Sequence, residues 1–506
     1  MGCGSSTSAA AVSPDPDGDN AGQRNLSHVT SGQDNGPTPN VFKLLSLTGL
    51  DDAGGEAGQK NADGHSTVNG VDGDGKPASM QTFGRSTVQQ QPDVISSSAA
   101  VKVAVLVRPL LDHEKQKGCV ECVQLPGPGR VRLPAKPGGT GIADEKEGYN
   151  FEYDAVYKID NSAIGNELFR QLCLPVTERL CQGFNACILA YGQTGSGKTY
   201  NMGTAASMKE ALNPASKAVG VMPRLISSVF AYIAAASAKY DIELKVTYLE
   251  IYAENIQDLL KTSPQVSAAS SPQKGQERLD IRETAAGEVF VEGATELVVH
   301  SPQEVAAALD LGNSARAVGA HKMNEQSSRS HAIVTFIMQQ RVKACATKEV
   351  PSELRYLRSR LHLVDLAGAE RQKDTGAQGK RFDEAISINK GLMELGNVIQ
   401  ALTEGGKRKH VPYRNSKLTR MLQDSLGGNA ETLMLACVSP ADTCHEQTLN
   451  TLRYAQRARA IRNSLRLNNK QSPEEELAYL RSVITQLQSE NAQLKGRVAQ
   501  LETKGR

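Results

Sequence analysis

The segment with the clearest chemical potential spans residues 192–199 and reads GQTGSGKT. Glycines in such a loop let backbone N–H groups turn towards a polyphosphate, and the Lys198 ammonium group adds charge beside the β- and γ-phosphates. The Thr199 hydroxyl is of the kind that binds Mg²⁺. The predicted phosphate-binding residues are Gly192, Gln193, Thr194, Gly195, Ser196, Gly197, Lys198 and Thr199.

Two further polar segments indicate the reaction. The first switch segment, residues 324–331 (NEQSSRSH), concentrates hydroxyl groups and charge, and the second switch segment, residues 365–370 (DLAGAE), follows an apolar run. A carboxylate at a strand end, followed by a turn glycine, suits water-mediated Mg²⁺ binding and a γ-phosphate sensor. Either segment alone could be a capped turn, but behind a phosphate loop they predict hydrolysis of a nucleoside triphosphate.

Short apolar strands must position these segments. Residues 101–107, 187–191 and 361–366 are rich in aliphatic side chains, and the last two runs lead into the phosphate loop and the second switch segment. Strand-like and helix-like stretches alternate from residue 101 to about residue 463, which predicts an α/β domain around a central sheet.

Composition narrows the class of protein. The formal net charge is only +2, but the chain after residue 100 is basic, which is typical of a protein with an acidic partner. The sequence contains no run of 18 apolar residues, so we expect no transmembrane helix. Cys119 and Cys122 form a single C-x-x-C pair without a histidine cluster, which favours reduced thiols over a zinc or redox site.

These segments together resemble a kinesin motor domain over about residues 101–468. Residues 410–420 (HVPYRNSKLTR) add a further signature of that family, and residues 422–429 and 436–442 most resemble its fourth, chromokinesin-type branch. The resemblance implies a P-loop NTPase kinesin motor fold, with a mostly parallel central sheet flanked by helices. It also implies ATP as substrate, Mg²⁺ as cofactor and the microtubule as partner.

The resemblance assigns roles to individual residues. Pro109 and Tyr200 would sandwich the adenine, Thr199 and Ser328 would bind Mg²⁺ directly, and Asp365 would hold it through water. The residues expected to sense the γ-phosphate, position the attacking water and relay its proton are Ser327, Ser328, Arg329, Gly368 and Glu370. Such positioning and charge stabilisation is what phosphoryl transfer requires.

Three positions depart from the family pattern. Leu106 replaces an arginine near the adenine, Ala369 replaces the serine of DLAGSE, and residues 321–322 read His-Lys where Thr-Asn is usual. We expect one stacking contact to be lost and turnover to be slower, with the site still active.

A basic stretch after the second switch segment should bind the acidic microtubule. Without the resemblance, it would be read as an ordinary solvated surface. The residues expected at the microtubule are Lys407, Arg408, Lys409, Arg414, Lys417 and Arg420. The following neck linker would dock through Leu465, Leu467 and Asn468, and its place after the motor domain implies plus-end-directed movement.

The sequence divides into a disordered extension (1–98), a motor domain (99–463), a neck linker (464–472) and a coiled-coil helix (473–506). Apolar residues are sparse in the extension, which favours disorder. A heptad seam through residues 477–501 predicts a parallel homodimer, and an amphipathic helix packed on the motor domain is the alternative. The seam consists of Leu477, Leu480, Ile484, Leu487, Asn491, Leu494, Val498 and Leu501.

The N-terminus reads MGCGSS, which matches a myristoylation pattern with Gly2 as acceptor and Cys3 placed for palmitoylation. Two acyl chains would attach the protein to a membrane through the long extension. A start codon placed there by accident is the alternative. We expect the protein in the cytoplasm on microtubules, with membrane association depending on this acylation.

Two functions fit the same motor domain: a walking motor, or a nucleotide-gated microtubule-binding protein that regulates ends without walking. A GTPase switch is disfavoured because the sequence contains no NKxD-type guanine motif. No nucleic-acid partner is inferred. No cargo is inferred from the sequence, and the chain is interpreted as a fragment of a longer motor.

Overall fold

The computed structural model describes most of the chain from residue 96 onwards. Among the predicted site residues, Gly2, Cys3, Ser327, Lys407, Arg408 and Lys409 lie outside the described part of the chain. The described residues are 96–135, 147–160, 162–205, 207–212, 220–261, 279–284, 287–322, 328–348, 350–370, 380–404, 410–469, 477, 480, 481, 484, 485, 488, 489 and 491–496.

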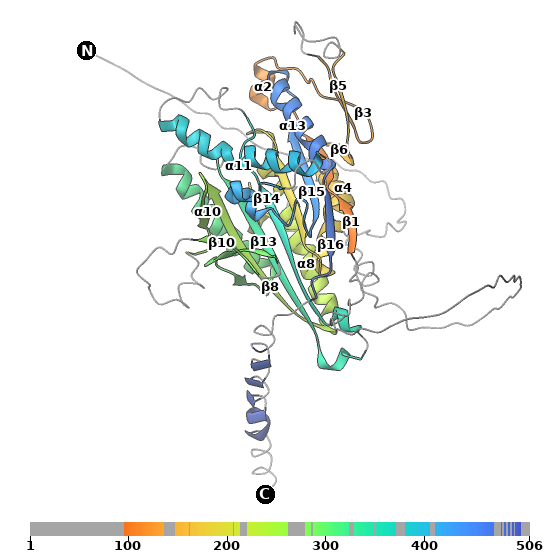
Figure 1. Ribbon diagram of the computed structural model, residues 1–506, viewed down its shortest axis with the longest axis vertical. Helices are drawn as coiled ribbons and strands as arrows, with labels where there is room; N and C mark the ends of the chain where they lie inside the picture. Colours follow the sequence, from red (N-terminus) through yellow and green to blue (C-terminus); the bar gives the residue numbers. More distant parts are fainter. Residues whose placement is uncertain are drawn as a thin grey trace, which may run out of the picture. The chain divides into compact units, whose positions relative to one another are not determined.

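A nine-stranded sheet forms the centre of the domain (Figure 1). Pairing is parallel from β14 to β6 and antiparallel from β12 to β14. The strand order is β12 (Leu297–Val298), β8 (Tyr240–Tyr252), β13 (His331–Val342), β14 (Tyr356–Asp365), β7 (Ala186–Tyr191), β15 (Glu431–Val438), β2 (Lys102–Val107) and β6 (Ala155–Lys158), with β9 (Asn255–Asp258) also paired to β8.

The sheet is therefore mixed, which corrects the expectation of a mostly parallel one. The connection between β13 and β14 carries only the 3-10 turns η3 (Ala344–Ala346) and η4 (Ser352–Leu354) among its described residues. Neighbouring strands joined without a crossover helix run antiparallel. The strands that carry the two switch segments therefore lie side by side in opposite directions, with Ala332 opposite Asp365.

Helices cover both faces of the sheet. β7 is buried at every position, as expected for a parallel strand between two helical layers. Ile188 belongs to the core on one face, whereas Cys187 and Leu189 belong to the core on the other, because successive side chains of a strand alternate.

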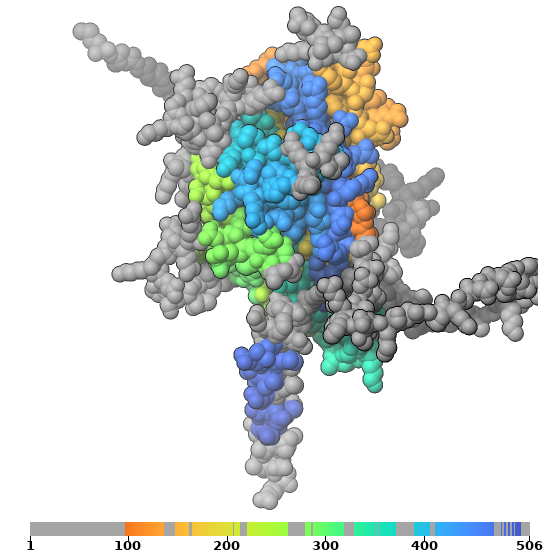
Figure 2. Space-filling view, in the orientation of Figure 1, coloured from red at the N-terminus to blue at the C-terminus, as the bar shows by residue number. Residues whose placement is uncertain are grey.

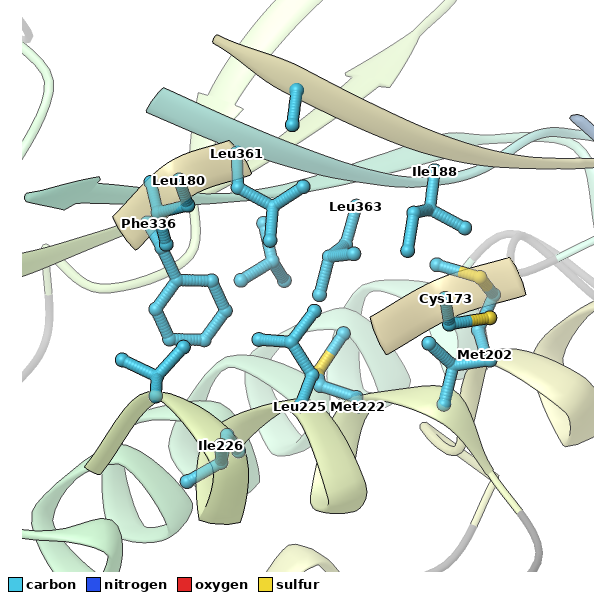
Figure 3. Close-up of a cluster of buried hydrophobic side chains, with 14 of the residues drawn as sticks. Cys173, Leu180, Ile188, Met202, Met222, Leu225, Ile226, Phe336, Leu361 and Leu363 are labelled. Carbon is cyan, nitrogen blue, oxygen red and sulfur yellow. The ribbon is translucent and has the colours of Figure 1, made fainter. Parts of the chain in front are cut away.

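The first face packs on a helical layer that includes α8, from which Leu225 and Ile226 lie beneath the side chains of β13 and β14, such as Phe336 and Leu363 (Figure 3). The helical elements on this face are α4 (Ser162–Leu168), the π-helical turn η1 (Phe169–Cys173), α5 (Leu174–Cys181), α6 (Lys198–Met202), α7 (Met208–Ala211), α8 (Val221–Ala236) and α10 (Pro302–Lys322). The helices on the second face are α11 (Lys380–Thr403), α12 (Lys417–Met421) and α13 (His445–Arg459).

Smaller elements surround this core. A short sheet joins β3 (Gln124–Gly127), β4 (Arg130–Leu133) and β5 (Tyr149–Glu152), and a separate hairpin joins β10 (Asp280–Glu283) to β11 (Val289–Glu292). The remaining short elements are α2 (Asp112–Gln116), η6 (Tyr413–Asn415) and η7 (Asp442–Cys444).

The two ends of the domain pair with each other. β1 (Ser96–Ala100) runs antiparallel to β16 (Arg462–Arg466), and the two strands lie side by side (Figure 1). Ser97 is opposite Leu465. The predicted boundary at residue 99 therefore cuts a strand, because β1 begins at Ser96. The first residues of the predicted neck linker therefore lie in β16 and pair with β1.

Beyond Asn469, the described residues at 477, 480–481, 484–485, 488–489 and 491–496 are helical. The seam residues Leu477, Leu480, Ile484 and Leu494 are each about half exposed in the single chain. The coiled coil through residues 477–501 stays a prediction. In the described residues, no helix is both long and apolar enough to span a membrane.

Candidate functional site

The phosphate loop connects β7 to α6 and depends on glycine for its shape. Gly192 has a φ of 151°, and a Cβ atom there would lie 2.1 Å from the Cys437 carbonyl oxygen of β15. No side chain fits in that space. Gly197, with a φ of 96°, adopts the left-handed conformation from which α6 begins. The loop is therefore held against the sheet at its first residue and turned into a helix at its end.

Lys198 lies inside this loop. Its Nζ donates to the carbonyl oxygens of Gly192 and Gln193, each at 2.9 Å. Burial lowers the pKa of Lys198, and the neighbouring Asp365 and Glu370 carboxylates oppose that shift. The ammonium group is thus placed within the loop, with two acidic neighbours that favour its charged form.

Thr199 and Asp365 form the part of the site that fits a metal ion. The Thr199 hydroxyl donates to Asp365 Oδ2 at 2.7 Å. Asp365 is buried, and its Oδ1 has no hydrogen-bond partner among the described residues. A buried carboxylate oxygen without a partner is costly unless another group, such as a cation with its waters, satisfies it. The pair fits Mg²⁺, as predicted for these residues.

The two switch segments are bonded to each other. The Gly368 N–H donates to the Ser328 carbonyl oxygen at 2.8 Å, and the Ala367 N–H donates to His331 Nδ1 at 3.0 Å. Burial, together with the positive charge of Arg316, lowers the pKa of His331 to about 3, so its ring is neutral and accepts this bond. The N–H predicted to sense a γ-phosphate is therefore engaged by the first switch segment here.

The second switch segment also contacts the phosphate loop. The Glu370 carboxylate accepts from the Thr194 N–H at 2.8 Å and from the Thr194 hydroxyl at 2.6 Å. The Ala369 N–H donates to the Gly192 carbonyl oxygen at 3.1 Å, a backbone bond that the missing serine hydroxyl does not affect. Phosphate loop, first switch and second switch thus form one bonded unit, whereas pairing of Glu370 with Arg329 stays a prediction.

Residues 106–461 match the family described as the kinesin motor domain, over more than half of the chain. The chain belongs to this family. Kinesin-like protein KIN-4A of Arabidopsis thaliana is 41% identical over 77% of this chain and 38% of the relative. Chromosome-associated kinesin KIF4A of Homo sapiens is 44% identical over 77% of this chain and 29% of that protein. The chain therefore spans about a third of the length of these relatives.

Solved kinesin structures agree with this assignment. One, described as a fast kinesin with implications for ATPase mechanism and interactions with microtubules, has a TM-score of 0.62 at 35% identity and covers 74% of this chain and 96% of its own. A KIF14 dimer bound to a microtubule with AMP-PNP has a TM-score of 0.61 at 36% identity, over 74% of this chain and 98% of its own. The predicted kinesin motor fold and chromokinesin-type branch are confirmed, and the domain is of the ATP hydrolase class.

The predicted adenine platform of the kinesin motor domain lies on the surface. Pro109 is exposed, and Tyr200 is 52% exposed. Leu106 is buried in β2, as part of the core on the α8 face. Its replacement of arginine therefore extends the hydrophobic core, and the base is left with Pro109 and Tyr200 as the proposed contacts.

Arg108 is a residue of the site that the sequence analysis missed. Its Nε donates to the Gly195 carbonyl oxygen of the phosphate loop at 2.7 Å. Its two terminal nitrogens bind the Glu114 carboxylate at 2.7 and 2.6 Å, and one also reaches the Ser439 hydroxyl at 2.9 Å. The only local signal was an arginine at a strand end, directly before Pro109.

A second missed group is a buried polar network beneath the switches. The Ser330 hydroxyl donates to Glu250 Oε1 at 2.5 Å, and Arg316 Nε lies 3.3 Å from the same oxygen. Arg316 Nη1 lies 3.8 Å from Asp365 Oδ2. These residues come from α10, β8 and the two switch segments, so their spacing in the sequence gave no sign that they meet.

The described residues of the predicted microtubule face lie on η6 and α12. The exposed fraction of the side chain is 77% for Arg414, 34% for Lys417 and 15% for Arg420. Lys407, Arg408 and Lys409 lie outside the described residues. Arg414 is thus the most accessible of the three described cations, and Arg420 is largely covered.

The predicted neck linker is bonded to the kinesin motor domain. Leu465 is buried, and the Asn468 N–H donates to the Gly183 carbonyl oxygen at 3.0 Å. The Asn468 side chain binds the amide side chains of Asn429 at 2.9 Å and Asn185 at 3.1 Å. These contacts agree with the docking roles expected of Leu465 and Asn468.

Proposed function

We propose that this kinesin motor domain hydrolyses ATP at residues 192–199, is stimulated by microtubules, and couples hydrolysis to plus-end-directed movement. The observation that carries the proposal is the bonded unit of phosphate loop and switch segments. For the Gly368 N–H to reach a γ-phosphate, its bond to Ser328 must open, and Glu370 must leave Thr194 to pair with Arg329. Nucleotide state and switch conformation are therefore coupled by direct contacts.

In this proposal, Lys198 neutralises phosphate charge, and Thr199 with Ser328 and Asp365 holds Mg²⁺. The bound ion would neutralise charge on the β- and γ-phosphates. Ser327, Arg329 and Glu370 would orient the attacking water, and Glu370 would accept its proton through a relay. Arg329 belongs to the first switch segment and Glu370 to the second, so closure of both switches onto the phosphate loop would complete the site.

The element that moves in each ATPase cycle would be β16, together with the chain that follows it. Solved relatives that interact with microtubules support the microtubule as the track, with the basic residues of η6 and α12 as contacts. Docking of β16 in one nucleotide state and release in another would direct the segment after Asn468 forwards. A linker at the C-terminal end of the domain supports movement towards the plus end.

The test is the ATPase rate of the purified chain with and without microtubules, followed by gliding of polarity-marked microtubules over the immobilised protein. We expect a rise of at least tenfold in rate and gliding with the minus end leading. A rate that microtubules leave unchanged would contradict the proposal. Stimulated hydrolysis without gliding would instead favour the non-walking alternative.

The variant Glu370→Ala serves as the control in this experiment. It removes the carboxylate that should relay the proton but leaves Lys198 and Thr199 in place. We expect ATP binding to remain and hydrolysis to fall by about a hundredfold or more, the size typical of losing a general base. This separates failure to hydrolyse from failure to bind nucleotide.

A further inference from the structure

The hairpin of β10 and β11 packs beside α12, the helix that carries Lys417 and Arg420. In Figure 2 the green surface that includes this hairpin adjoins the blue surface that includes α12. The hairpin is acidic on this side, with Asp280 at the start of β10 and Glu283 at its end. An acidic element therefore borders the basic face proposed to bind the microtubule.

Each described cation of that face has an acidic partner on this hairpin. Arg420 donates a hydrogen bond to Glu283 Oε2, and Arg414 Nη2 lies 3.7 Å from the same oxygen. Lys417 Nζ lies 4.0 Å from Asp280 Oδ1. One carboxylate, Glu283, thus faces two guanidinium groups, and one of these, Arg414, is the most exposed cation of the three.

The charge on Glu283 persists at neutral pH. The hydrogen bond from Arg420 and the positive charges of Arg420 and Arg414 lower the pKa of Glu283. A carboxylate so close to a cation reduces the positive potential that the cation presents to solvent. Because the Arg414 side chain is 77% exposed, its ion pair with Glu283 contributes little to stability, and an acidic partner of higher charge density can replace the carboxylate there at small cost.

We propose that Glu283 sets the affinity of this face by competing with acidic side chains of the microtubule for Arg414 and Arg420. The inference rests on the proposed function, because it requires the microtubule to bind at η6 and α12. Glu283 then weakens attachment and eases detachment in every cycle. Its removal should strengthen binding, the opposite of what removal of a contact residue would do.

The same hairpin offers a matched control. Glu292 lies on β11 and pairs with Arg282 Nε at 2.9 Å, with both side chains more than half exposed. Its ion-pair partner, Arg282, is on the hairpin itself and not on η6 or α12. Glu283→Gln and Glu292→Gln therefore change the net charge equally, but only Glu283→Gln releases Arg414 and Arg420.

The experiment is co-sedimentation of the full chain with stabilised microtubules in AMP-PNP, at several salt concentrations. At low salt, we expect Glu283→Gln to lower the Kd roughly threefold to tenfold and Glu292→Gln to change it less than about twofold, since screened charges act locally. The Glu283→Gln variant should also show a steeper loss of affinity with salt. Thermal unfolding and nucleotide binding, expected to be unchanged, show that both variants are folded.

A double-mutant cycle locates the effect. Arg414→Gln should weaken binding more in the Glu283→Gln background than in the wild type, because Arg414 is then free of its internal partner. If the wild type binds and Glu283→Gln behaves like Glu292→Gln, or binds more weakly than the wild type, the inference is wrong and the proposed function stands. If neither the wild type nor any variant binds microtubules, both are wrong.

Discussion

At the scale of single residues, Arg108 links the phosphate loop to the rest of the domain. The Arg108 and Glu114 side chains are only 11% and 8% exposed. A buried ion pair stabilises a protein only when both charges are fully bonded. Glu114 meets this condition because it also accepts from the Leu111 N–H at 2.8 Å, and the bonds from Arg108 and Leu111 hold the pKa of its carboxyl at about 2.

Replacing Glu114 with Gln should lower the free energy of unfolding by about 2 kcal/mol at pH 7, because Arg108 loses its buried counter-charge. The folded-state pKa of Glu114, about 2, lies below its ordinary value of 4.5. The ion pair therefore contributes fully above that ordinary value, and its contribution is lost as the pH falls towards the folded-state value. Urea unfolding at pH 7 and at pH 3 should show that the difference between wild type and variant narrows in acid.

Glu121→Gln is the control for this prediction. Glu121 pairs with Lys158 at 2.8 Å, but the two side chains are about 40% exposed. Such a pair should contribute less than about 0.5 kcal/mol. Equal losses in the two variants would show that Glu114 has no special role beside the phosphate loop.

At the scale of elements, Asn463 is one of the residues that attach β16 to the domain. The side chain of this buried residue donates to the carbonyl oxygens of Ser425 and Ala430, and its Oδ1 accepts from the Gly427 N–H at 2.7 Å. Asn463 therefore bonds three backbone groups of the domain, one of which, the Ser425 carbonyl oxygen, also accepts from the Thr432 hydroxyl at 2.6 Å. The same strand pairs with β1 on its other side.

Replacing Asn463 with Ala should destabilise the domain by about 2–3 kcal/mol and increase hydrogen exchange in β16 and β1, because the Gly427 N–H and the Ala430 carbonyl oxygen lose their bonds to this side chain. Ser464→Ala is a suitable control, since Ser464 is exposed and its bond to Gly428 comes from the backbone N–H. Exchange rates in β16 that are equal in the two variants would contradict this role of Asn463.

At the scale of the whole molecule, the heptad seam predicts the oligomeric state. Ile484 is 54% exposed in the single chain and occupies an a position of the seam. Ile484→Lys should shift the dimer towards monomer by at least tenfold in Kd, because a charge would enter an apolar seam. Sedimentation equilibrium measures this, and Ser489→Lys, on the outer face of the same helix, should leave the dimer intact. A wild-type chain that is monomeric at micromolar concentration would contradict the predicted coiled-coil dimer.

Attachment through the N-terminus is a separate prediction for the whole molecule. Gly2 and Cys3 precede a long polar extension, so acylation would tether the motor domain to a membrane at a distance. Gly2→Ala should abolish sedimentation with membranes when the chain is produced in cells that myristoylate proteins. An unchanged membrane fraction would remove acylation as the means of attachment.

Local sequence was sufficient for much of the site. The spacing of Gly192, Lys198 and Thr199 determines a phosphate loop, because the glycine that shapes the backbone, the ammonium group and the hydroxyl group all lie within residues 192–199. Asp365 could be predicted for the same reason, since it ends a buried strand. Arg108, Arg316 and Glu250 could not, because they meet partners on separate elements: Arg108 bonds Gly195, 87 residues away, and Arg316 bonds Glu250, 66 residues away.

The sequence by itself determined the family, the phosphate loop and the two switch segments, because each is a short motif whose chemistry depends on neighbouring residues. Only the tertiary structure decided that half of the sheet is antiparallel, that Leu106 belongs to the core, and that Glu283 lies against Arg414 and Arg420. Those facts depend on which segments meet in space. A basic stretch read alone appears available to an acidic partner, and only the folded chain shows that a neighbouring hairpin already partly neutralises it.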